Sequence, residues 1–258
     1  MEDMDMWTRS ELKTRAKAAL KGTFWISVLV VVLFLIITGG ENSNLTLKLG
    51  EDATREMEVG TGILGYDVDI DYLQRYIGIP LTTFFVLFGA LAGIVSVLWS
   101  IFIAAPLSTG LSRYFLVNRR NKGENTPLNL FFPFRSGFYL NVVLVTFMQT
   151  LFIFLHFLLL IIPGIIKFFA YYMVPWILAD DPSMNYKDAL ALSSEMTHGH
   201  KMDIFVLELS FIGWYLLAIL TLGLAAPLVT TYRYATIAEL YEHMKHGETV
   251  LETSPEYF

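Results

Sequence analysis

The sequence predicts an all-α, polytopic membrane protein: a helix bundle of about six transmembrane helices with additional interfacial helices. Six apolar stretches fill most of its 258 residues. Hydrophobic residues make up 55% of the chain and charged residues only 16%, whereas about a quarter of the residues in a soluble domain are charged. Basic residues also gather in the short connections that would lie on one side of a membrane. Together these observations favour a single integral membrane domain over residues 1–258.

The composition excludes several classes of function. A chain this apolar leaves no room for a separate soluble enzyme domain. Its net charge of -6 comes largely from the acidic segment 39–79 and the termini, and it has no basic stripe with interleaved aromatic residues, so we do not expect nucleic acid as a partner. The absence of cysteine excludes disulfides, thiolate catalysis and thiolate metal sites. We find no phosphate-binding loop, dinucleotide glycine pattern or nucleophile elbow, and we expect no cofactor.

Residues 1–22 predict a cytoplasmic helix that lies on the membrane. Thr8 and Glu11 have the spacing of a capping box, which satisfies exposed backbone donors at a helix start. Two stripes follow on different faces, an apolar one of Leu12, Ala16, Ala19 and Leu20 and a basic one of Arg9, Lys13 and Lys17. Such a helix buries its apolar stripe at the headgroup level and attracts anionic lipid, at about 1 kcal/mol per basic residue. A solvated helical leader is the alternative, but the apolar span that starts at Phe24 favours the interfacial helix.

The first span covers about Thr23 to Thr38. We interpret it as an uncleaved span because a long region containing acids precedes it and no small-x-small cleavage site follows. Segment 39–79 would then be extracytoplasmic, and its alternating apolar residues predict a short hairpin around residues 50–54. Asp67, Asp69 and Asp71 lack the glycine and glutamate that a calcium loop requires, so a solvated acidic face is expected there.

The next three spans follow closely on one another. The second covers about Ile79 to Ala105, and its helix is expected to continue past Pro106 towards Asn118. Phe138 to Ile162 makes the third span, which Pro163 and Gly164 are expected to break. Ile165 to Ala179 makes a short fourth, below the ~20 apolar residues that an untilted crossing needs.

Residues 180–202 predict a second cytoplasmic surface helix and loop. The helix covers Ser183 to His198, shows an apolar stripe of Ala189, Leu192 and Met196, and is closed by Gly199. Asp203 to Leu222 is the fifth span. Gly223 separates it from a sixth, which ends near His243.

The distribution of Lys and Arg predicts the orientation, because positive short loops stay in the cytoplasm. The N-terminal leader carries five basic residues, the connection 113–135 carries five, and segment 183–201 carries two. With six spans all three fall on the same side, and segment 39–79 falls on the opposite side. The prediction is therefore a multi-pass protein with both termini in the cytoplasm.

Several separate blocks of sequence resemble one family. In the second half they are 161–167 (IIPGIIK), 174–180 (VPWILAD), 194–196 (SEM), 199–201 (GHK), 209–214 (LSFIGW), 220–223 (LTLG) and 238–241 (AELY). Nearer the start they are 9–13 (RSELK), 21–22 (KG), 106–107 (PL) and 110–113 (GLSR). Together they are similar to the bacterial integral-membrane family catalogued as domain of unknown function 975. The resemblance spans nearly the whole chain except segment 39–79. It implies a multi-pass protein of the bacterial cytoplasmic (plasma) membrane and implies no activity.

Ionisable residues inside spans are costly, so each is a candidate site residue. The set consists of Glu208, Arg233, His156, Lys167 and Glu239. Arg233 lies deepest and requires a partner, for which Glu208 is the obvious acid. A structural Arg–Glu pair is the expected outcome, and an ion or headgroup site is the alternative.

The other three candidates have ordinary explanations. Lys167 and Glu239 lie near the ends of their spans, where a charged side chain can reach the interface. His156 lies midway along its span and is expected to bond to a neighbouring helix. His198 and His200 lack the i, i+4 spacing of a helical zinc pair, so no metal is expected.

Three functions remain after these exclusions. The first is a non-enzymatic membrane component that acts with membrane lipids, with anionic lipid at the N-terminal helix, or with partner proteins, including further copies of itself. The second is a small transporter or permease-like protein with a polar intramembrane site at Glu208 and Arg233. The third, an intramembrane enzyme, lacks a paired catalytic constellation and is not expected.

Overall fold

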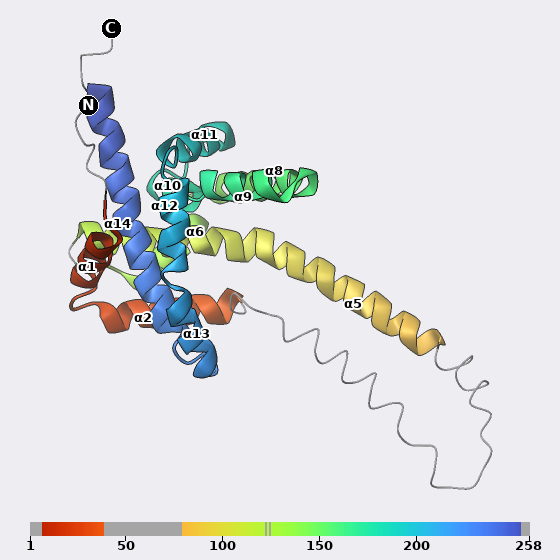
Figure 1. Cartoon of the computed structure of the whole chain (residues 1–258). Coiled ribbons are helices and arrows are strands. Elements are labelled where there is room, and N and C mark those ends of the chain that lie inside the picture. Colours follow the sequence, from red (N-terminus) through yellow and green to blue (C-terminus); the bar gives the residue numbers. More distant parts are fainter. Residues whose placement is uncertain (1–6, 39–78, 122, 124, 254–258) are drawn as a thin grey trace, which may run out of the picture.

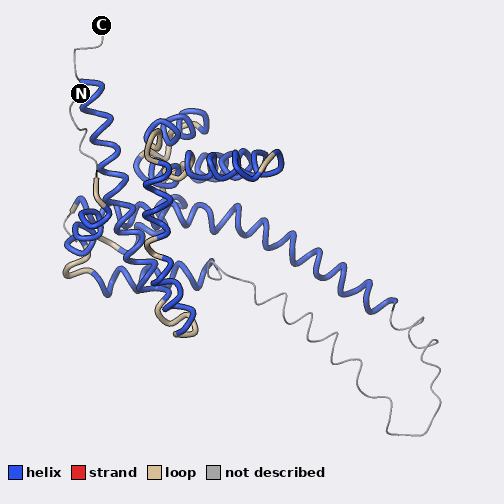
Figure 2. Tube along the Cα trace, viewed as in Figure 1, coloured by secondary structure: helices blue, strands red, loops and turns tan. Residues whose placement is uncertain are grey.

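The computed structural model describes residues 7–38, 79–121, 123 and 125–253, and these residues form helices joined by turns and short loops, with no strand among them (Figures 1 and 2). The predicted all-α class is therefore confirmed. Apart from Ile79, segment 39–79 lies outside the described residues, and so do the hairpin and the aspartate face predicted there.

The described part of the chain begins with two helices, α1 (Arg9–Ala19) and α2 (Phe24–Thr38), which are bent by 99° relative to each other. The predicted cap is present, because the Thr8 side chain accepts a hydrogen bond from the backbone N–H of Glu11 at 3.3 Å. Leu12 and Ala16 of the apolar stripe are fully buried, and α1 packs along α14 (Ala226–Thr253). The stripe is therefore covered by protein, where the sequence suggested lipid headgroups.

One continuous helical run follows, made of α5 (Ile79–Trp99), a π-helical turn η2 (Ser100–Ala104) and α6 (Ala105–Arg120), so the helix continues past Pro106 as predicted. Its part from Thr83 to Arg120 contains 38 residues. Pro106 has no N–H to donate to the carbonyl of Phe102, four residues earlier. The Tyr139 hydroxyl donates to that carbonyl instead, at 2.7 Å. In Figure 1, α5 projects away from the other helices.

Two short elements, η3 (Pro127–Phe131) and α7 (Phe132–Arg135), lead into a helical hairpin made of α8 (Tyr139–Leu159) and α9 (Ile161–Ala170). The break lies at Leu160, three residues before the predicted break at Pro163. Pro163 sits in the first turn of α9, where a proline costs no hydrogen bond. A Cβ on Gly164 would lie 2.5 Å from the Phe157 ring, so this glycine permits the close approach of α8 and α9.

The remaining helices are α10 (Val174–Asp180), α11 (Tyr186–Met196), α12 (Lys201–Leu209), α13 (Ile212–Leu220) and α14. Gly199 and Gly223 end their segments with φ of +82° and +87°, at the positions where the sequence places boundaries. The predicted fifth span is interrupted, because Ser210 and Phe211 form a turn between α12 and α13.

Among the residues that the structure describes, four helical runs are long and apolar enough to cross a membrane: Thr83–Arg120, Tyr139–Leu159, Ile161–Asp180 and Lys201–Leu220. The bent pair of α1 and α2 makes five if it counts as one span. Joining α9 and α10 gives the short fourth span 20 residues. Helix α14, the predicted sixth span, is not among these runs, and the count of six is not confirmed.

The core lies around α6, α10 and α14. Aromatic side chains fill it: the ring of Tyr234 lies 5.7 Å from that of Phe115 and 5.8 Å from that of Trp176. Large apolar side chains are exposed on α5, α8, α9 and α13, including Leu158 at 76% and Ile219 at 71%. A soluble monomer rarely exposes so much contiguous apolar surface, so the outer surface is compatible with a lipid environment.

Candidate functional site

Arg233 of α14 and Glu208 of α12 form an ion pair. The Arg233 Nε donates to Glu208 Oε1 at 3.0 Å and to Oε2 at 2.9 Å. Tyr172, in the turn between α9 and α10, completes the group: its hydroxyl donates to Glu208 Oε1 and accepts from Arg233 Nη2 at 3.3 Å. The Arg233 and Glu208 side chains are 19% and 21% exposed. Three segments therefore meet at one compensated pair, which we call the interior triad.

The triad has no group left over for chemistry. Both carboxylate oxygens of Glu208 are engaged by Arg233, and Tyr172 adds a second donor to one of them. Removing either charge would leave the other in a poorly solvated position, which costs several kcal/mol. The sequence suggested the Arg–Glu pair and missed Tyr172, because a tyrosine next to a spanning segment fits an aromatic belt equally well.

The other three predicted site residues lie elsewhere. His156 bonds within its own helix, with Nδ1 2.7 Å from the Phe152 carbonyl oxygen, and not to a neighbouring helix as expected. The Lys167 ammonium lies 5.3 Å from the centre of the Tyr171 ring. Glu239 contacts Arg119, with 2.9 Å between Oε1 and Nε. The five residues do not form one site.

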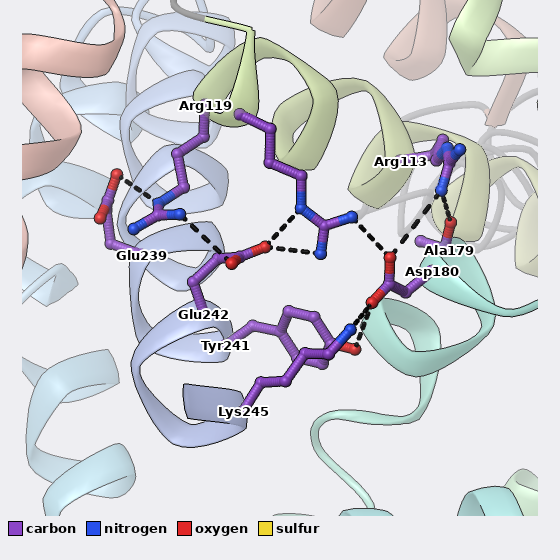
Figure 3. A network of polar contacts seen from close by, with 9 residues as sticks. Arg113, Arg119, Ala179, Asp180, Glu239, Tyr241, Glu242 and Lys245 are labelled. Atoms are coloured by element: carbon purple, nitrogen blue, oxygen red, sulfur yellow. Dashed lines mark hydrogen bonds and ion pairs between the residues drawn. The ribbon is translucent and has the colours of Figure 1, made fainter. Parts of the chain in front are cut away.

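A larger charge cluster joins the C-terminal turns of α6 and α10 to α14 (Figure 3). We call it the charge network and define it by Arg113, Arg119, Arg120, Asp180, Glu239, Glu242 and Lys245.

Each acid of the charge network has at least one basic partner. Arg120 donates to Glu242 Oε1 at 2.7 Å and to Asp180 Oδ1 at 2.6 Å. Arg119 Nη1 lies 3.3 Å from the second oxygen of Glu242. Asp180 is also bonded by Lys245, and the carbonyl of Ala179 accepts from Arg113 at 2.8 Å. The Glu242 side chain is only 4% exposed, so its charge depends on these arginines.

This network changes the interpretation of the basic connection 113–135. The sequence treats Arg113, Arg119 and Arg120 as loop charges that orient the protein. The structure places all three on α6, with acids of α10 and α14 as partners. Their acidic partners are 60 to 123 positions away in the chain, so no local spacing reveals the network.

A cavity of about 580 Å³ lies between the start of α1 and one side of α12. We call it the N-terminal pocket; it is lined by Trp7, Thr8, Arg9, Ser10, Lys13, Asp203, Val206 and Ser210. The Lys13 ammonium donates to the Ser210 hydroxyl at 2.7 Å and lies 4.5 Å from the centre of the Phe211 ring. Burial lowers the pKa of Lys13, and the charges of Arg9 and Lys17 lower it further.

Metal ligands do not gather in the part of the chain that the structure describes: no group of three His, Cys, Asp or Glu side chains is positioned to hold an ion. His200 lies near Asp203, with 3.5 Å between Nδ1 and Oδ2.

Comparison with known proteins identifies a family and no activity. No curated protein matches the chain, and no solved structure matches it. Residues 87–248 match a family described as protein of unknown function (DUF975). The matched region includes α6 to α13, the interior triad and the charge network, and it leaves out α1 and α2. The chain therefore belongs to the DUF975 family.

Proposed function

We propose that this protein is a non-enzymatic, multi-pass component of the bacterial cytoplasmic membrane that acts by binding lipids at its cytoplasmic face. The observation that carries the proposal is the contrast between paired and unpaired charge. The ionisable groups between the helices compensate one another in the triad and the charge network. Arg9 and Lys13 of α1, by contrast, line the N-terminal pocket. Their helix is bent by 99° from the apolar helix α2.

The bend supports a surface position for α1. If α2 crosses the bilayer, a helix nearly perpendicular to it runs along the membrane surface, at the level of the headgroups. Its basic side chains then face the surface potential of anionic lipids. The apolar surfaces of α5, α8, α9 and α13 are suited to the hydrocarbon region.

The orientation is testable directly because the chain contains no cysteine. Thr126→Cys and Glu195→Cys are expected to react with a membrane-impermeant maleimide only after the cells are permeabilised. Leu224→Cys is expected to react in intact cells. Lys245→Cys tests the sixth span, since its labelling matches that of Thr126→Cys if α14 returns the chain to the cytoplasm. The opposite labelling pattern would reverse the proposed orientation.

Lipid binding itself is testable by native mass spectrometry of the protein released from native-lipid nanodiscs. A retained lipid in fixed stoichiometry supports the proposal. A bare protein with only weakly held bulk lipid, under conditions that preserve the folded state, would sink it. A retained protein partner would shift the function to assembly.

A small transporter is the second candidate, and one observation favours it. The turn at Ser210 and Phe211 breaks a 20-residue apolar run directly after Glu208, and broken helices build substrate sites in transporters. Transport requires a water-filled path to the triad. Glu208→Cys is expected to stay unreactive to a small water-soluble maleimide in a sealed bundle, whereas rapid reaction would favour transport.

A further inference from the structure

The N-terminal pocket is lined by groups that can bind a phosphate, and no side chain of the described residues fills it. We propose that it binds the phosphodiester headgroup of a membrane lipid, and this inference rests on the proposed lipid-binding function. Arg9 and Lys13 supply positive charge, and neither forms an ion pair with a carboxylate in the part of the chain that the structure describes. The arginines of the charge network are, in contrast, already compensated.

The start of α1 adds backbone donors to the pocket. The first N–H groups of any helix lack partners within the helix, and the helix dipole favours an anion there. Thr8 already satisfies one of these donors, since its side chain accepts from the backbone N–H of Glu11. The N–H groups of Arg9 and Ser10 remain at the end of the helix, next to their own side chains in the pocket wall.

An independent observation is the indole of Trp7. This side chain lines the pocket and is only 8% exposed, and its Nε1–H has no hydrogen-bond partner among the described residues. A buried donor without a partner costs about 1–3 kcal/mol. The Nε1 atom itself is buried, so the indole must turn towards the cavity before an acceptor oxygen there can remove that cost, and a phosphate carries several such oxygens.

The carboxylate of Asp203 restricts which lipid headgroups fit the pocket. Its carboxylate lies in the same pocket wall as the two cations, so a bare anion would be repelled at that end. A headgroup that ends in its own donor, the ammonium of ethanolamine or the hydroxyls of glycerol, complements both ends of the pocket. A choline headgroup carries charge but no N–H or O–H donor for Asp203.

The surroundings favour a lipid over a soluble phosphate as the source of this group. Trp7 directly precedes α1 and Lys13 lies on it, this helix is bent by 99° from the apolar α2, and Val206 adds an apolar wall. Tryptophan is enriched at membrane–water interfaces because its ring is apolar and its N–H is polar. A diester held there can keep its acyl chains in the bilayer.

The test measures lipid retained by the full-length protein in nanodiscs of defined composition. The background lipid is phosphatidylcholine, and phosphatidylethanolamine or phosphatidylglycerol is added at the same fraction in separate samples. We expect stoichiometric retention of either added lipid and little selective retention of phosphatidylcholine. The Arg9→Gln/Lys13→Gln variant is expected to lose this retention by about tenfold or more, because charge-assisted hydrogen bonds to phosphate are lost.

A matched control also removes one arginine and one lysine charge from the N-terminal region, but at residues outside the pocket. Arg15 and Lys21 are exposed and do not line the cavity, so Arg15→Gln/Lys21→Gln is expected to change retention less than about twofold. Trp7→Phe is a conservative variant that is expected to fold, because it keeps an aromatic ring and removes the indole N–H donor. It is expected to weaken retention about threefold, a change of the size of one hydrogen bond.

The Trp7 indole also reports occupancy independently of lipid counting. Its ¹⁵N–H resonance, assigned through Trp7→Phe, is expected to shift when the added lipid is present and to stay unchanged with inorganic phosphate alone. A shift with inorganic phosphate and none with lipid would overturn the lipid assignment in favour of a soluble anion. If the pocket and control variants lost retention equally, the assignment of the headgroup to the pocket would be overturned, while lipid binding by the protein would stand. Retention of no lipid by the wild type would overturn the proposed function itself.

Discussion

The charge network and the N-terminal pocket both contain arginine and lysine, but only in the network do acidic side chains pair with them. In the network, Arg119 and Arg120 surround a Glu242 carboxylate that is 4% exposed, and Asp180 holds the end of α10 against α14. In the pocket, Lys13 bonds to a neutral hydroxyl and Arg9 lines a cavity. The number of basic residues is therefore a poor guide to their role. Whether an acid from a distant helix compensates them distinguishes a structural contact from a binding surface.

The largest effect is expected where the compensated network is broken. Glu242→Gln removes the shared partner of Arg119 and Arg120, which keep only Glu239 and Asp180, and the network is left with four cations and two acids, so we expect a loss of about 3 kcal/mol in the free energy of unfolding. Glu195→Gln is the matched control, because Glu195 is exposed on α11. Unfolding in mixed micelles with increasing denaturing detergent measures both. Equal stabilities would show that the network carries no structural role.

A somewhat smaller effect is expected in the interior triad. Arg233→Met leaves Glu208 with only the Tyr172 hydroxyl and is expected to cost about 2 kcal/mol, because both side chains of the pair are about one-fifth exposed. The double variant Arg233→Met/Glu208→Met removes both charges and is expected to recover most of this loss. The same unfolding assay measures the recovery. A double variant as unstable as the single one would contradict a purely structural pair.

The smallest effect on stability is expected in the pocket. Arg9→Gln removes an exposed charge that takes part in no ion pair within the described chain, so the unfolding midpoint should not move measurably. The same variant should lower the retention of phosphodiester lipid in nanodiscs. A marked destabilisation without any change in lipid retention would place Arg9 with the structural cations and remove the contrast between the two regions.

Hydropathy predicted the helices well because burial in lipid or protein demands the same apolar residues. It predicted the helix through Pro106 and the ends at Gly199 and Gly223. It placed the hairpin break at Pro163, three residues late, because a proline fits the first turn of a helix as well as a break. Beyond the break, Gly164 packs closely against Phe157 of the preceding helix, a contact between two helices that no local sequence pattern reveals.

The sequence predicts a site residue only where the energetic cost of placing a charge in an apolar segment identifies it. Arg233 and Glu208 stand out because a charge within an apolar run needs a partner. Tyr172 and Glu242 do not, since their importance comes from helices that meet only in the folded chain. The pocket was the least accessible to sequence reasoning. It joins α1, outside the region that matches the family, to α12, inside it.

The unbroken run from Thr83 to Arg120 has a mechanical consequence. At 1.5 Å per residue its 38 residues extend about 57 Å, nearly twice the ~30 Å thickness of a bilayer's hydrocarbon core. One end is an apolar helix whose large side chains are exposed, and the other carries the arginines of the charge network. Because the helix is continuous, a change in the tilt of α5 would move α6 relative to α10 and α14 unless the helix bends between them. The π-helical turn at Ser100–Ala104, where the Tyr139 hydroxyl donates to the Phe102 carbonyl, interrupts the regular α-helix and is the point at which it can bend.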